Sequence, residues 1–146
     1  MTSYTNPTRA AFSEFIAIER DGPVAMLNLI ALREKADYDD GRDVTGKQAY
    51  EEYGRTAGKI FGRVGGKQIW LGVPELMLIG PATEKWDIAF IAQYPDGKAF
   101  VEMVKDPDYQ AIVFHRTAAV ADSRLLRLNP VAPGDEFGAE FDSKSG

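Results

Sequence analysis

The sequence predicts one α+β domain with the order β-α-β-β-α-β, the ferredoxin-like arrangement with an antiparallel sheet. Two observations carry this prediction: one segment has a clear helical period and caps, and two strand-like segments are apolar on both faces. The chain has 146 residues, 45% of them hydrophobic and 27% charged, which suits one domain with one core. We expect the domain over residues 23–128, after an N-terminal helical extension (1–22) and before an acidic flexible tail (129–146).

The overall charge and composition narrow the classes of partner. A formal net charge of -5 argues against nucleic acid and against an anionic membrane surface as partners. The chain contains 0 cysteines, which removes disulfides and thiolate metal sites. No apolar run reaches signal-peptide length or the ~20 residues of a membrane span. We therefore expect a cytoplasmic protein whose partners are small molecules or proteins.

The first elements are a short helix and a buried strand. Apolar residues recur at helical spacing after Asn6 and Pro7, which we expect to cap and begin the helix. The first strand runs from Val24 to Leu32 and is apolar on both faces except at Asn28. This strand must therefore be covered on both sides.

A charged loop over residues 33–44 leads into the best-defined helix. Thr45, with Gln48 three residues later, forms a capping box. Gly65 and Gly66 end the helix. Its apolar stripe is made of Ala49, Tyr50, Tyr53, Ala57, Ile60, Phe61 and Val64.

Two further strands follow. We expect residues 67–73 and 75–80 to form one long strand with a bend near Gly72 and Pro74. The strand at 86–94 pairs back on it and is again apolar on both faces in its middle.

The second half of the pattern contains a broken helix and the last strand. Asp96 caps a helix that we expect over residues 97–105. Asp106 and Pro107 interrupt it and restart it as a piece that runs to about residue 121. The last strand covers residues 123–128.

The first and third strands are central in this arrangement, and they are the two that are apolar on both faces. Helices cover one face of the sheet. The other face would be polar if it met water, so its apolar content predicts a homodimer formed through the sheet face.

Several segments carry a family resemblance. The segments AYEEYGRTAGKIFGRVGG, YPDGKAF and above all DPDYQAIVFHRTAAVADSRLL resemble DUF1330, a family of unknown function in the dimeric α+β barrel superfamily. The resemblance implies a ferredoxin-like protomer and a sheet-to-sheet dimer. It also implies that any pocket lies between helices and sheet. Superfamily members include cofactor-free monooxygenases, isomerases, haem-dependent dismutases and plain ligand-binding proteins.

Two polar residues in apolar surroundings are candidates for ligand binding. Asn28 needs a partner for its amide, which a ligand, a neighbouring side chain or the second subunit could supply. Arg116 follows Tyr109 and Ile112 on one helical stripe. Its guanidinium needs an anionic ligand or a structural partner. The family match of Asp106 to Arg116 favours the ligand.

Candidates for proton transfer are His115, the single histidine, and Tyr53. Either could equally be a packing residue. Trp70 and Tyr109 join the ligand-binding candidates, and we expect Tyr53 and Trp70 to approach each other. The aromatic set from which these were chosen is Tyr50, Tyr53, Trp70, Trp86 and Tyr109.

Two motif-like stretches are rejected. Residues 41–47 have the spacing of a phosphate-binding loop, but Gln48 replaces the Ser or Thr that would bind magnesium. The aspartates of the same loop suggest calcium, but Arg42 stands where a glycine is needed. We expect no metal site and no cofactor.

The resulting hypothesis is a homodimer that binds a small, mostly apolar organic molecule between helices and sheet. Asn28 and Arg116 would orient the molecule. If the protein is an enzyme, the resemblance favours cofactor-independent oxygenation or isomerisation, with His115 or Tyr53 moving a proton. The alternative is a non-enzymatic structural or protein-interaction domain with a filled core.

Overall fold

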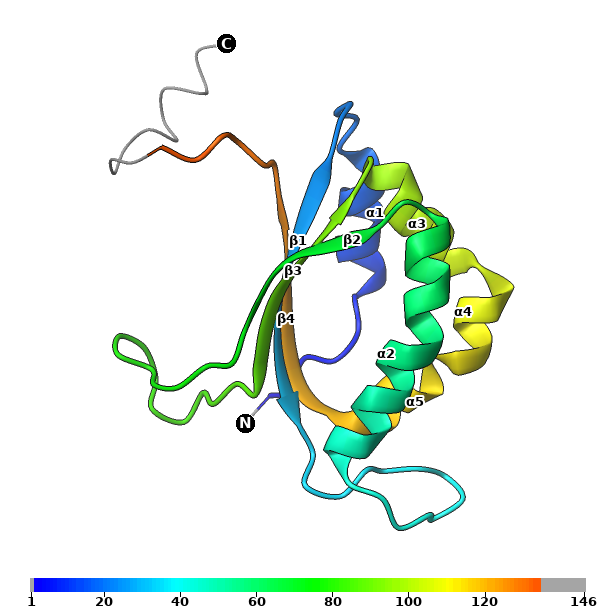
Figure 1. Cartoon of the computed structure of the whole chain (residues 1–146), viewed down its shortest axis with the longest axis vertical. Coiled ribbons are helices and arrows are strands. Elements are labelled where there is room, and N and C mark those ends of the chain that lie inside the picture. The colour runs from blue at the N-terminus through cyan, green and yellow to red at the C-terminus, as the bar shows by residue number, and fades with distance from the viewer. Residues whose placement is uncertain (1, 135–146) are drawn as a thin grey trace.

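The computed structural model describes residues 2–134, which form a sheet of four strands with helices on one face (Figure 1). The strands are antiparallel and lie in the order β2-β3-β1-β4. The strands are β1 (Val24–Leu32), β2 (Lys67–Gly72), β3 (Ile88–Tyr94) and β4 (Val120–Leu128). The helices are α1 (Arg9–Ala17), α2 (Gly46–Arg63), α3 (Gly97–Lys105), α4 (Pro107–Ile112) and α5 (Phe114–Ala119). The predicted α+β fold is confirmed, and β1 and β3 are central as expected.

Helix α2 forms as predicted. The Oγ1 atom of Thr45 accepts a hydrogen bond from the backbone N–H of Gln48 at 3.0 Å, and the Oε1 atom of Gln48 accepts one from the N–H of Thr45 at 2.9 Å. These two bonds satisfy donors that every helix start leaves free. The buried stripe of α2, which includes Ala57 and Ile60, packs toward the sheet.

Several element boundaries differ from the prediction. Thr8, and not Asn6, caps α1, because its side chain accepts the N–H of Ala11. The piece after Asp106 is two short helices that meet at Val113. Strand β4 begins at Val120, because the backbone there already pairs with β1.

The largest error of the prediction lies after β2. The expected strand over residues 75–80 is wrong: pairing with β3 stops at Gly72, and residues 73–87 form a segment without helix or strand. We call this segment the arm. Since β3 begins at Ile88, and not at Trp86 as predicted, residues 75–80 have no paired strand beside them in the described protomer. In Figure 1 the arm projects to the side of the sheet opposite the helices.

The sheet face without helices is apolar. Its central residues Leu27, Leu29 and Ile91 are half-buried. At its margins, Trp70 is 54% exposed and Leu126 is 55% exposed. We call this surface the open face.

Residues 129–134 extend away from the end of β4. The remainder of the predicted acidic tail, residues 135–146, lies outside the described residues. None of the helices within residues 2–134 is long and apolar enough to cross a membrane.

Candidate functional site

The helix-facing row of β1 is interrupted at Asn28. The neighbours of Asn28 on this face, Met26 and Ile30, are 3% and 1% exposed, whereas Asn28 itself is only half-buried. Met26 belongs to one buried cluster of the core and Ile30 to a second, and Phe90 of β3 packs against both. The helix layer therefore covers the positions on either side of Asn28 more tightly than Asn28 itself.

The residues paired with Asn28 define the sides of this position. Phe90 of β3 and Leu125 of β4 lie directly opposite Asn28 in the sheet, so both share its helix-facing side. Leu125 is 42% exposed. The Nδ2 atom of Asn28 donates to the backbone oxygen of Met26 at 3.1 Å. We call this position, with Phe90 and Leu125, the Asn28 break.

Two tyrosines from the helix layer form a polar pair. The hydroxyl oxygens of Tyr53 on α2 and Tyr109 on α4 lie 2.8 Å apart, and both rings pack against the core cluster that contains Met26. Burial raises the pKa of Tyr53 well above its usual value, and the bond to Tyr109 adds to this. Burial also raises the pKa of neighbouring Tyr50 to about 12, against the opposing charge of Arg116. These phenols are therefore neutral hydrogen-bond donors at physiological pH.

Arg116 brings a cation next to the Asn28 break. The Nη2 atom of Arg116 donates to the Oγ atom of Ser123 at 3.4 Å, and its Nη1 atom donates to the backbone oxygen of Thr5 at 2.6 Å. Ser123 pairs with Ile30, one helix-facing position along from Asn28, a step of about 7 Å. Among the described residues, no carboxylate forms a salt bridge with Arg116. A guanidinium has five N–H donors, so three remain for other partners.

The N-terminal segment, residues 2–8, brings the Thr5 carbonyl to Arg116. Tyr4 binds β4 at two points: its N–H donates to the Oδ1 atom of Asp122 at 2.9 Å, and its carbonyl accepts the N–H of Ser123 at 2.7 Å. The Oγ atom of Ser123 donates to the same carbonyl at 2.7 Å. The extension before the domain is thus part of the surroundings of Arg116.

His115 lies in a different cluster. Its Nδ1 atom is 2.6 Å from the hydroxyl of Tyr38, and both residues are buried. Tyr38 reaches this position from the charged loop, and the Arg42 guanidinium lies 4.1 Å from the centre of its ring. Burial lowers the pKa of His115, with Arg42 acting in the same direction and Glu52 opposing it. His115 is therefore neutral in the folded protein at pH 7.

This lowered pKa predicts that acid destabilises the fold through His115. The unfolded chain binds a proton near pH 6.5, and the folded chain binds it only at lower pH. The contribution of His115 is thus complete above pH 6.5 and is lost as pH falls. We expect the free energy of unfolding, measured with urea at one protein concentration, to rise between pH 5 and pH 7.5. The substitution His115→Gln should flatten this rise, and an unchanged slope would contradict the burial of a neutral imidazole.

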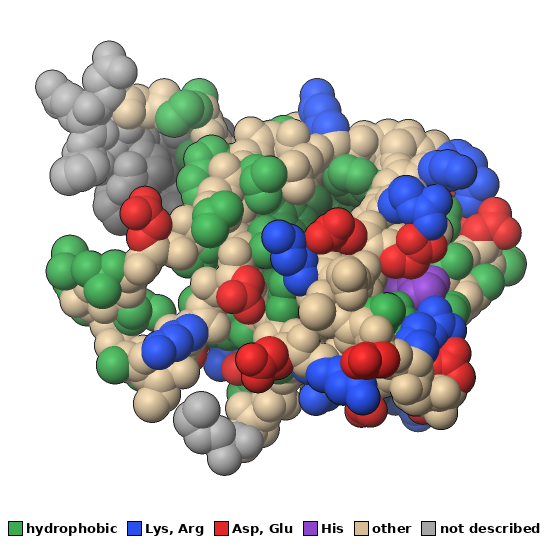
Figure 2. Space-filling view, turned by 60° about the horizontal axis from the view of Figure 1, so that its bottom comes forward, with side chains coloured by type: hydrophobic (Ala, Val, Ile, Leu, Met, Phe, Trp, Pro, Cys, Tyr) green, Lys and Arg blue, Asp and Glu red, His purple; other side chains and the backbone are tan. Residues whose placement is uncertain are grey.

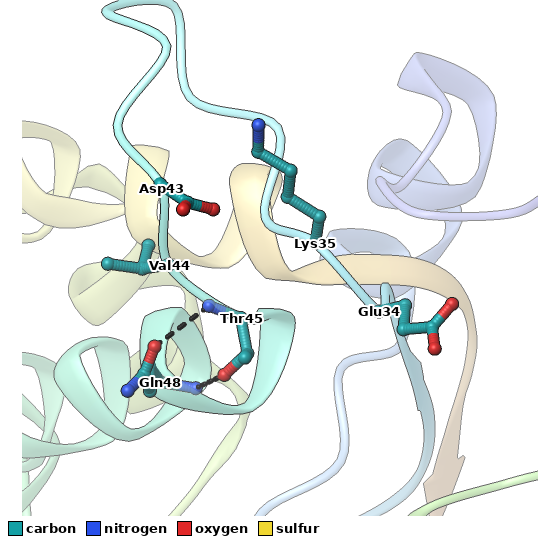
Figure 3. A pocket seen from close by; sticks show the side chains of 6 residues that line it. All are labelled: Glu34, Lys35, Asp43, Val44, Thr45 and Gln48. Atoms are coloured by element: carbon teal, nitrogen blue, oxygen red, sulfur yellow. Dashed lines mark hydrogen bonds between the residues drawn. The ribbon is translucent and has the colours of Figure 1, made fainter.

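Two depressions of the surface lie at the charged loop. One, of about 420 Å³, is lined by Glu34, Lys35, Asp43, Val44, Thr45 and Gln48 (Figure 3). A second, of about 360 Å³, lies around Tyr38 and Arg42. Their charged groups are exposed or paired within the loop, as Arg42 is with Asp40. Within residues 2–134, no three His, Asp or Glu side chains gather to hold a metal ion.

The structure brings together some of the predicted ligand-binding residues but not all of them. Asn28, Arg116, Tyr109 and Tyr53 share the helix-facing side of the sheet. The predicted approach of Trp70 to Tyr53 is wrong, because Trp70 pairs with Ile91 and therefore lies on the open face.

Sequence reasoning also missed two residues near the candidates. Tyr38 lies in the charged loop, and its signal of burial is that it is a lone aromatic residue among charged ones. Leu125 carried no signal, because its exposure depends on where the helices end.

Comparison with known proteins agrees with the fold. The RPA0582 protein of Rhodopseudomonas palustris, a protein of unknown function, is 54% identical in its methylated form over 92% of this chain and 100% of its own, with a TM-score of 0.89. None of the curated proteins matches the chain.

More distant solved structures share the fold alone. A dimeric ferredoxin-like protein of unknown function from Bacteroides fragilis is 13% identical over 75% of this chain and 98% of its own, with a TM-score of 0.50. SnoaB, a cofactor-independent oxygenase from Streptomyces nogalater, is 13% identical over 79% of this chain and 99% of its own, with a TM-score of 0.51.

The family model described as Domain of unknown function (DUF1330) matches residues 41–127. This range begins in the charged loop and ends in β4, so it includes α2, the tyrosine pair and Arg116. The chain therefore belongs to the DUF1330 family.

Proposed function

We propose that the protein is a homodimer in which each protomer binds one small, mostly apolar organic molecule at the Asn28 break. The observation that carries the proposal is the half-burial of Asn28 between two fully buried neighbours on the helix-facing side. The Nδ2 atom of Asn28 donates to the backbone oxygen of Met26, which leaves its second amide hydrogen and its Oδ1 atom for another partner. Its place at the junction of the two core clusters supports a ligand as its partner.

The chemistry around the break favours an apolar molecule with a polar or anionic head. Phe90 and Leu125 supply apolar walls on the two sides of Asn28. Arg116 supplies the remaining guanidinium donors one position away, and the buried phenols are kept neutral. A carboxylate accepts such donors in a paired geometry.

The same geometry favours binding over proton abstraction. A general base must be able to accept a proton near pH 7, and the raised pKa of Tyr53 leaves it a phenol. His115 is turned toward Tyr38 in the other cluster. The likeness to the oxygenase SnoaB is a likeness of fold alone. Oxygenation or isomerisation in this protein would need a base supplied by the substrate or by another residue.

One observation favours the second candidate, a non-enzymatic interaction domain with a filled core. Arg116 already donates to Thr5 and Ser123, and the hydroxyls of Tyr53 and Tyr109 satisfy each other. If no molecule displaces or joins these contacts, the helix-facing side has only a structural role. A cytoplasmic location and the domain limits given above are part of either proposal.

Calorimetric titration with octanoate, an apolar carboxylate, separates the two candidates. We expect one saturable site per protomer. The substitution Asn28→Leu should weaken octanoate at least tenfold, or about 1.4 kcal/mol, because it removes the amide and occupies the space beside it. Asn129→Leu, at an exposed asparagine after β4, serves as the matched control and should leave binding unchanged. Absence of saturable binding, or equal binding by Asn28→Leu, would favour the filled core.

A further inference from the structure

The arm carries the most exposed apolar side chains of the described chain. Leu76, Leu78 and Ile79 are 80%, 83% and 90% exposed, and Val73 is 76% exposed. Figure 2 shows apolar side chains gathered on this projecting segment at the left, which stands off the body of the protein. A contiguous apolar group of this kind on a projecting segment marks an interaction surface.

The root of the arm is fixed on the open-face side of the sheet. The N–H of Asp87 donates to the backbone oxygen of Ile30 at 2.7 Å, and the Oδ2 atom of Asp87 accepts the N–H of Leu32 at 2.7 Å. Arg124, which shares the open face with Leu29, lies 3.6 Å from the carboxylate of Glu84 and 5.1 Å from the ring of Trp86. The arm is therefore anchored at its root, residues 84–87, and exposed at its apolar tip, residues 75–80. The root lies beside the open face, so the arm continues that surface.

The tip matches an apolar partner surface. Residues 75–80 contain one charged side chain, Glu75, and at the root the carboxylate of Glu84 pairs with Arg124. The open face of this same chain is such a surface, with Leu27, Leu29 and Ile91 half-buried. Because tip and face belong to one chain and lie side by side, a two-fold axis would let two copies cover both at once.

The area of the open face points to the same partner. Four strands about 4.8 Å apart and roughly seven residues long give a flat footprint of roughly 450 Å². A stable interface takes about 800 Å² from each partner. The side chains give the open face a larger accessible surface than this flat footprint, so the face approaches the area that a dimer needs. The arm extends the same apolar surface at its margin.

We propose that the arm of each protomer crosses to a second copy of the chain and packs its apolar tip against the partner's open face. This inference rests on the homodimer of the proposed function. It adds that the contact is reciprocal, with each arm held by the other subunit.

The absence of cysteine from the sequence allows a direct test. A Leu78→Cys chain is labelled with 4-maleimidobenzophenone, mixed with unlabelled ¹⁵N-enriched chain to exchange subunits, and irradiated. We expect cross-linked peptides that join the label to the ¹⁵N chain within residues 24–32, 67–72, 88–94 or 120–128, the strands that form the open face. Lys59→Cys, at an exposed position of α2, is the matched control and should give no interchain link to these strands.

Each outcome has a separate meaning when light scattering is measured on the same sample. Dimers with links between chains at the open face support the proposal. Dimers in which Leu78→Cys links only within its own chain, or to the partner's helix layer, overturn the arm proposal and leave the homodimer standing. Monomers overturn both. The octanoate titration reports on the ligand site independently of these results.

Discussion

The substitution Leu126→Asp is expected to convert the proposed homodimer into monomers. Leu126 is 55% exposed on the open face of the protomer, so an aspartate there costs the isolated subunit little. In a sheet-to-sheet dimer the same aspartate would be buried against apolar side chains without a partner, and each dimer would contain two of them. A buried unpaired carboxylate costs several kcal/mol, so we expect the dissociation constant to rise by more than 100-fold.

Light scattering across a range of protein concentrations measures this effect. Ile16→Asp is the matched control, because Ile16 on α1 is 50% exposed and lies outside the open face. It should leave the dimer intact, and far-ultraviolet circular dichroism should show the same fold for both variants. A Leu126→Asp protein that stays dimeric would mean that the subunits meet through another surface.

The substitution Gly46→Ala is expected to destabilise the protein strongly. Gly46 is the first residue of α2, where the charged loop crosses the helix start, and a Cβ atom there would lie 1.9 Å from the backbone oxygen of Arg33. Backbone on both sides would have to move, so we expect a loss of about 3 kcal/mol in the free energy of unfolding. The displaced loop would also withdraw Tyr38 from His115.

Gly58→Ala provides a control of opposite sign on the same helix. Gly58 is exposed in the middle of α2, and a Cβ atom there meets nothing within 4 Å. Alanine is favoured over glycine in a helix interior by about 0.5–1 kcal/mol, so this variant should be more stable. Urea unfolding of both variants measures the difference. Equal effects would show that Gly46 is not held against the Arg33 backbone.

Much of the fold could be predicted because local signals and the burial pattern agreed. The Thr45 capping box and the stripe of α2 act within a few residues, and the structure retains both. The apolar character of both faces of β1 and β3 placed these strands in the centre of the sheet. Such consistency between local and global preferences makes a segment predictable.

The arm could not be predicted, because its short run of apolar residues is typical of a buried strand. Residues 75–80 have apolar side chains and little charge, but a strand also needs a neighbour to bond with. In the protomer β3 starts too late to provide one. An apolar pattern indicates that a segment will be buried, but it does not say whether its own chain or another chain buries it.

The sequence likewise predicted only part of the candidate site. The apolar surroundings of Asn28 on β1 followed from patterning, although the residue is only half-buried, whereas the side of the sheet on which Trp70 lies did not. A bulge between Gln68 and Trp70 shifts the register, and a shift of one residue moves a side chain to the other face. The contact of His115 with Tyr38 joins positions 77 residues apart, which no local signal could connect.

A ¹H–¹⁵N spectrum recorded during an octanoate titration reports directly whether a small apolar molecule binds at the Asn28 break. The side-chain amide of Asn28 is visible in this spectrum and is assigned by its loss in Asn28→Leu. We predict saturable shifts of this amide and of the backbone signals of Leu125 and Tyr109. Saturable shifts confined to the charged loop or to the arm, with the signal of the Asn28 amide unchanged, would contradict binding at the Asn28 break.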